Sequence, residues 1–310
     1  MNSRHRLGVT HILLIDGFLM MTRSLVAALS LAFLLMSAPL HAGFAEENTS
    51  PTIDVSITPD ALVFDPANIV GNAFPWQLNF QPAQSPVMEQ LAWLHEVLLI
   101  IITVITVVVL LLLAYACIRF REKRNPVPSK TTHNVLVEVV WTVLPILILV
   151  GIAIPSLRAH YFIDNETTIA NPDLTVKAVG HQWYWSYEYP DAAIGFDSNI
   201  KKDSELLTGE PRLLAVDNPI VVPVGKIVRL QLTGADVIHA FATPALGVKM
   251  DAVPGKLNET WFKAKKEGIY YGQCSELCGK LHGFMPIQIN VVSEAAYEAW
   301  LAWAKVKHAA

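Results

Sequence analysis

The chain has 310 residues, of which 53% are hydrophobic and only 16% are charged, and its formal net charge is −4. This composition is too apolar for an ordinary soluble protein and indicates membrane-spanning segments. Three cysteines are too few for a disulfide-rich scaffold. We expect no nucleic-acid partner.

Residues 1–45 have the features of a targeting segment. Arg23 precedes an apolar run from Leu25 to Met36, and small residues follow as far as Ala42. The run is short for a bilayer span, so we expect a signal segment cleaved near Ala42 or Ala45, with an uncleaved anchor as the alternative. Residues 46–90 then form an N-terminal segment outside the cytoplasm.

Two later apolar runs are long enough to cross a membrane. Val97–Ile118 is uninterrupted by charge, and Val139–Leu157 contains Pro145 and Pro155. A helix needs about 20 apolar residues to cross about 30 Å of hydrocarbon, and proline is tolerated there when neighbours satisfy the freed carbonyl groups. The sequence therefore predicts a helical hairpin over residues 91–160.

Basic residues set the orientation of this hairpin. The short connection 119–137 contains Arg119, Arg121, Lys123, Arg124 and Lys130, whereas residues 45–96 contain no Lys or Arg. By the positive-inside rule the connection is cytoplasmic. We expect a multi-pass protein in contact with membrane lipid, with its N-terminal and C-terminal parts on the outer side.

Short strands and turns follow over residues 171–293. Leu174–Val179 and Ile227–Leu232 alternate between apolar and other side chains, as half-buried strands do. Further strands are predicted at Val221–Val224, Thr260–Lys263, Ile269–Tyr271 and Ile287–Val292. This pattern favours an all-β sandwich or barrel. Ser293 can cap a final amphipathic helix over residues 294–310.

A cluster of soft and borderline metal ligands lies late in this β-region. Cys274, Cys278, His282 and Met285 occur within one short loop, and His239 lies upstream. A blue-copper site needs one Cys, two His and a weak Met. The second Cys allows two thiolates to bridge two copper ions, each completed by a His and a weak ligand. The loop therefore predicts an electron-transfer copper site.

Other interpretations of the loop remain open at this point. Cys274 and Cys278 can form a small disulfide if the domain lies outside the cytoplasm. The two cysteines with a nearby histidine can also hold structural zinc, although Met285 then has no role. A β-domain that presents metal ligands on a loop between late strands is a cupredoxin arrangement, which favours copper.

Four sequence blocks together resemble subunit II of bacterial haem–copper cytochrome c oxidases. The blocks are Val137–Pro145, Gly180–Tyr189, Asp236–His239 and Cys274–Met285. The resemblance covers nearly all of the chain after the targeting segment. It implies a membrane hairpin of two transmembrane helices followed by an all-β, cupredoxin-like Greek-key domain.

The resemblance also implies a binuclear copper centre, CuA, and its ligands. Its side-chain ligands would be the bridging thiolates of Cys274 and Cys278, the imidazoles of His239 and His282, and the thioether of Met285. The Glu276 carbonyl would be a further copper ligand. The Glu276 carboxylate would bind magnesium at the boundary with the catalytic subunit.

Aromatic residues around Trp183 have two interpretations. Alternating aromatics on a strand normally pack into the core on one face. The resemblance implies in addition that Trp183 is the entry point for electrons from cytochrome c. Carboxylates that would dock this basic partner are Glu188, Asp191, Asp217 and Asp236, each of which can also be an ordinary surface charge.

Glu138 lies at the cytoplasmic start of the second span. A carboxylate at a helix N-terminus is favoured by the helix dipole, which is a sufficient structural reason for it. The resemblance implies a second role at the mouth of a proton channel in the catalytic subunit.

The resemblance implies an electron-input subunit of an oxidoreductase in the bacterial inner membrane. It would pass electrons from cytochrome c to a haem in subunit I, where oxygen is reduced to water and protons are pumped. Further oxidase subunits would complete the complex. The alternative function is a membrane-tethered copper chaperone or carrier, which the long apolar hairpin and the Trp183 block disfavour.

Overall fold

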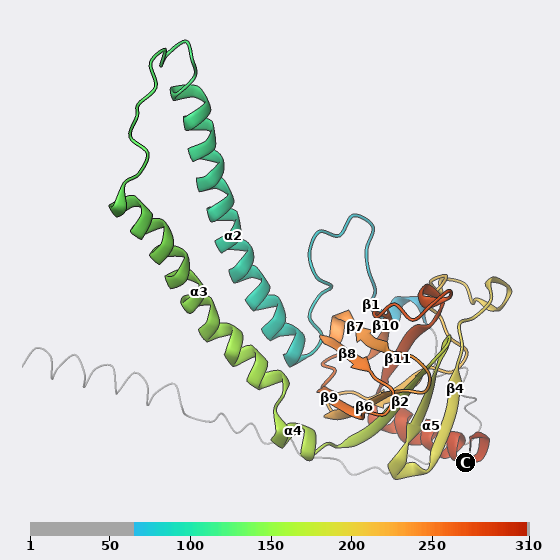
Figure 1. The fold of residues 1–310 in the computed structure, drawn as a ribbon. Helices are drawn as coiled ribbons and strands as arrows, with labels where there is room; N and C mark the ends of the chain where they lie inside the picture. Colours follow the sequence, from blue (N-terminus) through green and yellow to red (C-terminus); the bar gives the residue numbers. More distant parts are fainter. Residues whose placement is uncertain (1–64, 309–310) are drawn as a thin grey trace, which may run out of the picture. The chain divides into compact units, whose positions relative to one another are not determined.

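The computed structural model describes residues 65–308, so the predicted targeting segment lies outside the described residues. Two long helices, α2 (Pro86–Arg119) and α3 (Val135–Ile163), form a hairpin (Figure 1). Both are long and apolar enough to cross a membrane, and their apolar side chains are largely exposed. Such surface is stable in lipid and not in water, so the predicted hairpin is confirmed and the chain is a membrane protein.

Both helices begin at side-chain caps. Ser85 accepts a hydrogen bond from the backbone N–H of Met88 at the start of α2. At the start of α3, Asn134 accepts from the N–H of Val137, and Glu138 reaches back to the N–H of Asn134. These two hydrogen bonds satisfy backbone donors that a helix start leaves free. It gives Glu138 a structural role.

The β-region folds into two sheets. One sheet has the order β5 (Ile220–Pro223), β11 (Pro286–Val292), β10 (Gly268–Cys274), β7 (His239–Thr243) and β8 (Val248–Ala252), with β1 (Ile69–Gly71) pairing with β10. The other has the order β4 (Ile194–Ser198), β3 (Tyr184–Tyr189), β2 (Leu174–His181), β6 (Val228–Gly234) and β9 (Asn258–Phe262). The all-β, cupredoxin-like prediction is confirmed.

Alternation of buried and exposed side chains explains which strands can be predicted from the sequence. In β3 the side chains of Trp185, Tyr187 and Tyr189 are fully buried while those between them are partly exposed. The aromatic run is therefore core on one face, as expected. By contrast, every residue of β7 is buried. A strand buried on both faces shows no alternation, which is why His239–Thr243 was not predicted as a strand.

Two segments differ from their predicted form. No helix or strand was predicted between the hairpin and the first strand, but Glu166–Ala170 forms the short helix α4. Asn165 caps it by accepting from the N–H of Thr168 at 3.0 Å. Within the N-terminal segment, Ile69–Gly71 forms β1, which pairs in parallel with β10. Both segments take structure from a local cap or from a distant strand, and neither shows apolar periodicity.

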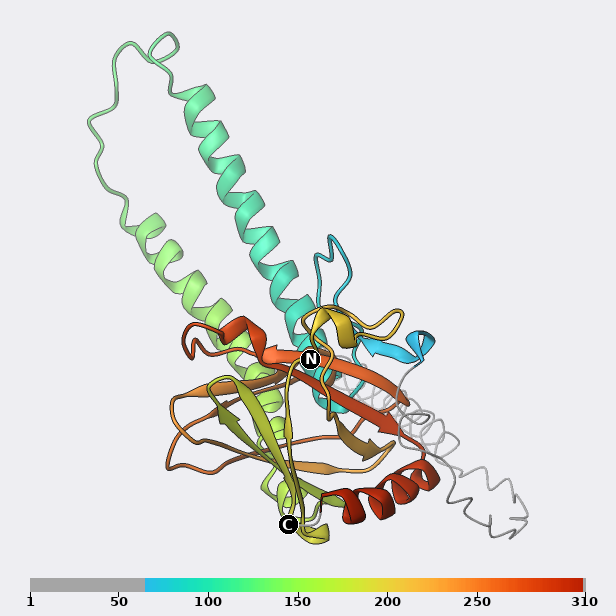
Figure 2. The same cartoon turned by 90° about the vertical axis from the view of Figure 1, so that its right-hand side faces the viewer.

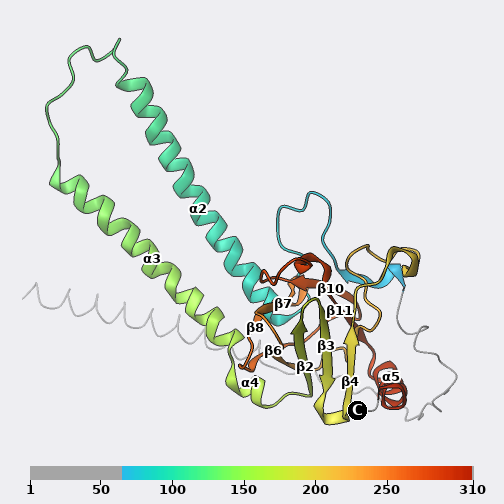
Figure 3. The same ribbon diagram turned by 45° about the vertical axis from the view of Figure 1, so that its right-hand side comes forward.

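The final helix, α5 (Glu294–Lys307), begins at Ser293, which accepts from the N–H of Ala296. It buries Tyr297, Trp300 and Ala304 on one face, as an amphipathic helix does. The rings of Trp300 and Tyr189 lie 5.1 Å apart. Figures 2 and 3 show α5 at the end of the sandwich away from the orange-red loop that follows β10. That loop contains the candidate metal ligands Cys278 and His282.

Candidate metal centre

Three neighbouring strands bring the predicted ligands together. His239 is the first residue of β7, and Cys274 is the last residue of β10, which pairs with β7. Cys278 and His282 lie on the loop after β10, and Met285 directly precedes β11. Because β10 is hydrogen-bonded to both β7 and β11, folding brings His239 close to ligands far along the sequence.

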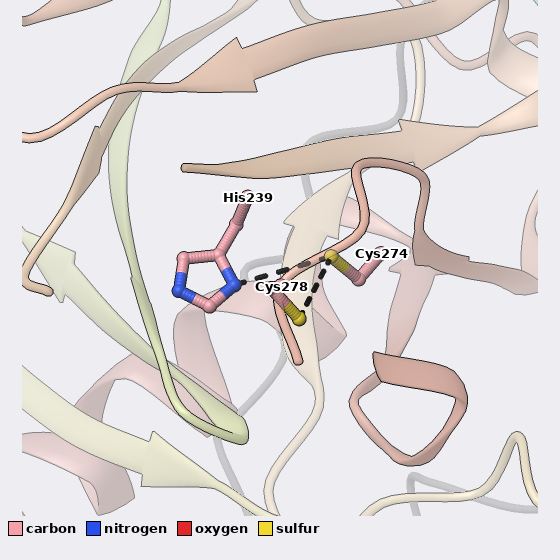
Figure 4. Close-up of side chains that lie close together, drawn as sticks. All are labelled: His239, Cys274 and Cys278. Atoms are coloured by element: carbon pink, nitrogen blue, oxygen red, sulfur yellow. Dashed lines mark hydrogen bonds between the residues drawn. The ribbon is translucent and has the colours of Figure 1, made fainter. Parts of the chain in front are cut away.

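The two sulfur atoms form the middle of the cluster. The Sγ atoms of Cys274 and Cys278 lie 3.9 Å apart, and Nδ1 of His239 lies 4.0 Å from the Cys274 Sγ (Figure 4). On the other side, the Cys278 Sγ lies 3.6 Å from Nδ1 of His282 and 3.5 Å from Sδ of Met285. Each thiol therefore has its own imidazole.

These donors fit copper. His239, both cysteines and Met285 are buried, which excludes water from most of the cluster. Thiolate, imidazole and thioether are ligands for copper rather than for calcium or magnesium. The cysteines are free thiols in the described structure, without a disulfide between them. The Cys274 Sγ also lies 3.4 Å from the carbonyl oxygen of Glu276, so a weak oxygen donor faces the pair.

The pKa values of the two thiols are shifted in opposite directions. Burial alone raises the pKa of Cys274, but hydrogen bonds with His239 and with backbone groups bring it down to about 6. Burial and the neighbouring Cys274 thiolate raise the pKa of Cys278 to about 12. Without metal, the negative charge of the Cys274 thiolate therefore keeps the Cys278 thiol protonated. A dication that binds both sulfurs as thiolates must displace the Cys278 proton.

Asp236 orients the His239 ring. Its Oδ1 lies 2.9 Å from Nε2 of His239, and a carboxylate accepts, so this nitrogen carries the proton. In the neutral ring the lone pair of Nδ1 then faces the sulfur atoms, as a metal ligand requires. Without metal, a second proton on Nδ1 can be donated to the Cys274 thiolate. Burial opposes ionisation of Asp236, but hydrogen bonds from His239 and from two backbone N–H groups lower its pKa. The sequence had suggested Asp236 only as a docking charge.

Gln182 is a residue that the sequence analysis missed. Its side-chain Nε2 donates to the carbonyl oxygen of Cys278 at 2.8 Å, and its backbone N–H donates to Asp236 at 2.7 Å. Gln182 therefore connects the loop that contains Cys278 to Asp236, the carboxylate that orients His239. Nε1 of Trp183 donates to the same Cys278 carbonyl at 3.3 Å. The half-buried indole thus contacts a candidate ligand residue directly.

Two glycines allow this close packing. A Cβ atom at Gly180 would lie 2.7 Å from the His239 ring, which is closer than any side chain tolerates. Gly279 has a φ of +122° and faces Gln182 and Trp183. Only glycine adopts this backbone conformation readily, so the loop passes under the indole without strain.

Comparisons with known proteins identify the family of this chain. A family model described as "Cytochrome C oxidase subunit II, transmembrane domain" matches residues 73–159, and one described as the periplasmic domain of the same subunit matches residues 174–292. Probable cytochrome c oxidase subunit 2 of Rickettsia felis is 54% identical over 229 residues, covering 74% of this chain and 72% of that protein. The chain belongs to the cytochrome c oxidase subunit 2 family.

Two further relatives illustrate the extent of the match. Cytochrome c oxidase subunit 2 of Cereibacter sphaeroides is 48% identical over 255 residues, which are 76% of this chain and 83% of that protein. The solved periplasmic domain of subunit II of cytochrome oxidase from Bradyrhizobium japonicum is 60% identical, with a TM-score of 0.42. It covers 44% of this chain and 97% of that chain. The family models and the curated relatives confirm the predicted resemblance.

The other predicted docking carboxylates of this oxidase subunit lie in different surroundings. Both oxygens of Glu188 contact Lys177 Nζ at 3.1 Å, so its charge is compensated. Asp217 accepts from the backbone N–H groups of Asn199 and Asn218. Asp191 follows β3, and its negative charge contributes to raising the pKa of Tyr297 on α5. The six residues of β3 separate Asp191 from Trp183 by about 17 Å or more.

Met285 provides the first test of the cluster. Met285→Leu keeps a buried apolar side chain of similar volume, so the domain should remain folded. We expect copper to remain bound but its reduction potential to rise, because a weak donor stabilises the more highly charged oxidised ion. Redox potentiometry measures this shift. Met88→Leu, a buried methionine at the start of α2, is the matched control; equal potentials in both variants would rule out Met285 as a ligand.

Proposed function

We propose that this chain is the electron-input subunit of a cytochrome c oxidase, with a binuclear copper centre. The observation that carries the proposal is the arrangement of two adjacent thiols, each facing one imidazole, in a buried cluster. Copper held there would supply a one-electron couple shared between two metal ions. Rigid surroundings on three strands would keep its ligands in place on reduction.

Trp183 would receive the electron from cytochrome c. Its indole is half-buried, so one edge is open to a partner while Nε1 contacts the Cys278 carbonyl. An aromatic side chain at this position also gives an apolar centre for docking. Carboxylates at the rim would raise the association rate with a basic partner and make it dependent on salt. The electron would leave through the metal loop to a haem in the catalytic subunit.

Other predicted roles belong to the same proposal. The Glu276 carboxylate is exposed beside the cluster and would bind magnesium where the catalytic subunit covers it. Glu138 would serve a proton channel in addition to its capping role. The β-domain would lie on the periplasmic side of a bacterial inner membrane, because the basic connection between the spans stays in the cytoplasm.

A membrane-tethered copper chaperone is the alternative function. A chaperone must exchange its metal with partners, so accessible ligands are expected. Here both cysteines, His239 and Met285 are buried, which favours a resident metal. The indole in contact with Cys278 also has no role in metal delivery. The geometry therefore supports electron transfer better.

Copper stoichiometry and electron spin resonance of the full chain in detergent test the proposal. We expect two copper ions per chain, with one unpaired electron shared equally between two nuclei after partial oxidation. One copper with a localised spin would instead support a mononuclear carrier. Zinc uptake, or a disulfide between Cys274 and Cys278 with no copper uptake, would refute electron transfer.

A further inference from the structure

A loop between β1 and α2 exposes large apolar side chains. We call residues 72–84 the aromatic loop; it leaves β1 and turns back to the start of α2 (Figures 1 and 3). Trp76 is 96% exposed, Leu78 102% and Phe74 60%. The loop contains no charged residue. Soluble surfaces rarely expose several large apolar side chains side by side, so this exposure indicates a partner.

Hydrogen bonds hold both ends of the loop in place. On one side, β1 pairs with β10. On the other, Gln84 donates its N–H to the carbonyl of Ala245 and accepts from the N–H of Lys265, each at 2.9 Å. At the tip, the backbone N–H of Gln77 donates to the carbonyl of Phe74, and the N–H of Phe74 donates to Oε1 of the Gln77 side chain, each at 3.1 Å. These hydrogen bonds therefore fix the position at which the loop exposes its apolar side chains.

The aromatic loop lies beside the helix at the level where the membrane-spanning run begins. The rings of Phe80 and His95 are 4.5 Å apart. Phe80 also lines an apolar hollow of about 440 Å³ together with Leu94 and Leu98 of α2. Uninterrupted apolar sequence starts at Val97, two residues after His95. The loop thus reaches the boundary between water and hydrocarbon.

We propose that the aromatic loop inserts Phe74, Trp76 and Leu78 into the lipid interface on the side of the β-domain. Tryptophan is favoured at this depth because its ring is apolar while its N–H can reach water and headgroups. The loop would fix the depth of α2 and hold the β-domain close to the membrane surface. A charged protein partner fits poorly, because the loop offers no charge. This inference depends on the membrane hairpin and not on the copper site.

Photo-crosslinking in native membranes tests this proposal on the complete oxidase. p-Benzoylphenylalanine replaces Trp76 in one variant and Leu78 in a second, so that failure of one variant to assemble leaves the other. The control position is Val306, which is 87% exposed and belongs to α5. Helix α5 lies at the end of the β-domain opposite the aromatic loop (Figures 1 and 3). After irradiation, adducts with lipid and with protein are separated by mass spectrometry.

We expect lipid adducts at positions 76 and 78 and none at position 306. Adducts only with the catalytic subunit at both loop positions would overturn the proposal and identify a protein interface instead. Absence of any adduct at both positions, with normal assembly, would mean that the loop faces water and would also overturn it. The copper content of each variant, unchanged in every case, separates these outcomes from failure of the proposed electron-transfer function.

Discussion

Replacing Cys278 by serine should abolish the two-copper centre and with it the transfer of electrons from cytochrome c. A hydroxyl group stays protonated near neutral pH and is a poor ligand for copper, so one bridging position is lost. Outer-shell partners of metal ligands alone change affinity or activity by about 10–100-fold, so loss of a ligand should lower oxidase turnover by more than about 100-fold. Copper content and steady-state oxygen consumption measure the effect.

Cys117→Ser is the matched control for this experiment. Cys117 is an exposed free thiol in α2, so its replacement changes the same functional group away from the cluster. Its copper content and turnover should equal those of the unchanged protein. If Cys278→Ser retains two copper ions and normal turnover, the bridging role is wrong. Loss of copper from both variants would indicate a general assembly defect.

The membrane hairpin and the ligand set were predictable because each depends on residue type within a short window. An uncharged run such as Val97–Ile118 has few stable environments apart from lipid, whatever the rest of the chain does. Likewise, two cysteines, a histidine and a methionine within one short loop are close together in any fold. Only His239 had to be brought in by tertiary structure; residue type made it a candidate, and the resemblance to the oxidase family implied its place in the centre.

The outer contacts of the cluster were not predictable in this way. Gln182 and the Cys278 carbonyl are 96 residues apart, and their hydrogen bond depends on two sheets packing in one register. Asp236 is close to His239 in sequence, but nothing in the spacing distinguishes an orienting carboxylate from a surface charge. Its assignment needed the 2.9 Å contact with Nε2. Sequence patterns report burial and ligand type well, and long-range hydrogen bonds poorly.

Trp183→Ala should slow reduction of the copper centre by cytochrome c at least about tenfold, which corresponds to about 1.4 kcal/mol in activation free energy. The substitution removes the ring that connects the surface to the Cys278 carbonyl but touches no candidate ligand. The electron spin resonance spectrum of the copper should therefore stay unchanged. Stopped-flow mixing with reduced cytochrome c at several ionic strengths measures the rate.

Gln182→Met makes this experiment specific, because it removes the other donor to the same carbonyl and leaves the indole in place. We expect it to alter the copper spectrum or potential, since the Cys278 loop loses its stronger hydrogen bond, while the entry rate falls much less than in Trp183→Ala. Equal rates for Trp183→Ala and the unchanged protein would remove Trp183 from the route. A changed spectrum in Trp183→Ala would show that its indole supports the metal loop rather than carrying electrons. A loss of entry rate in Trp183→Ala alone, with a change of spectrum or potential in Gln182→Met alone, would separate electron entry from ligand positioning at two side chains that donate to the same carbonyl.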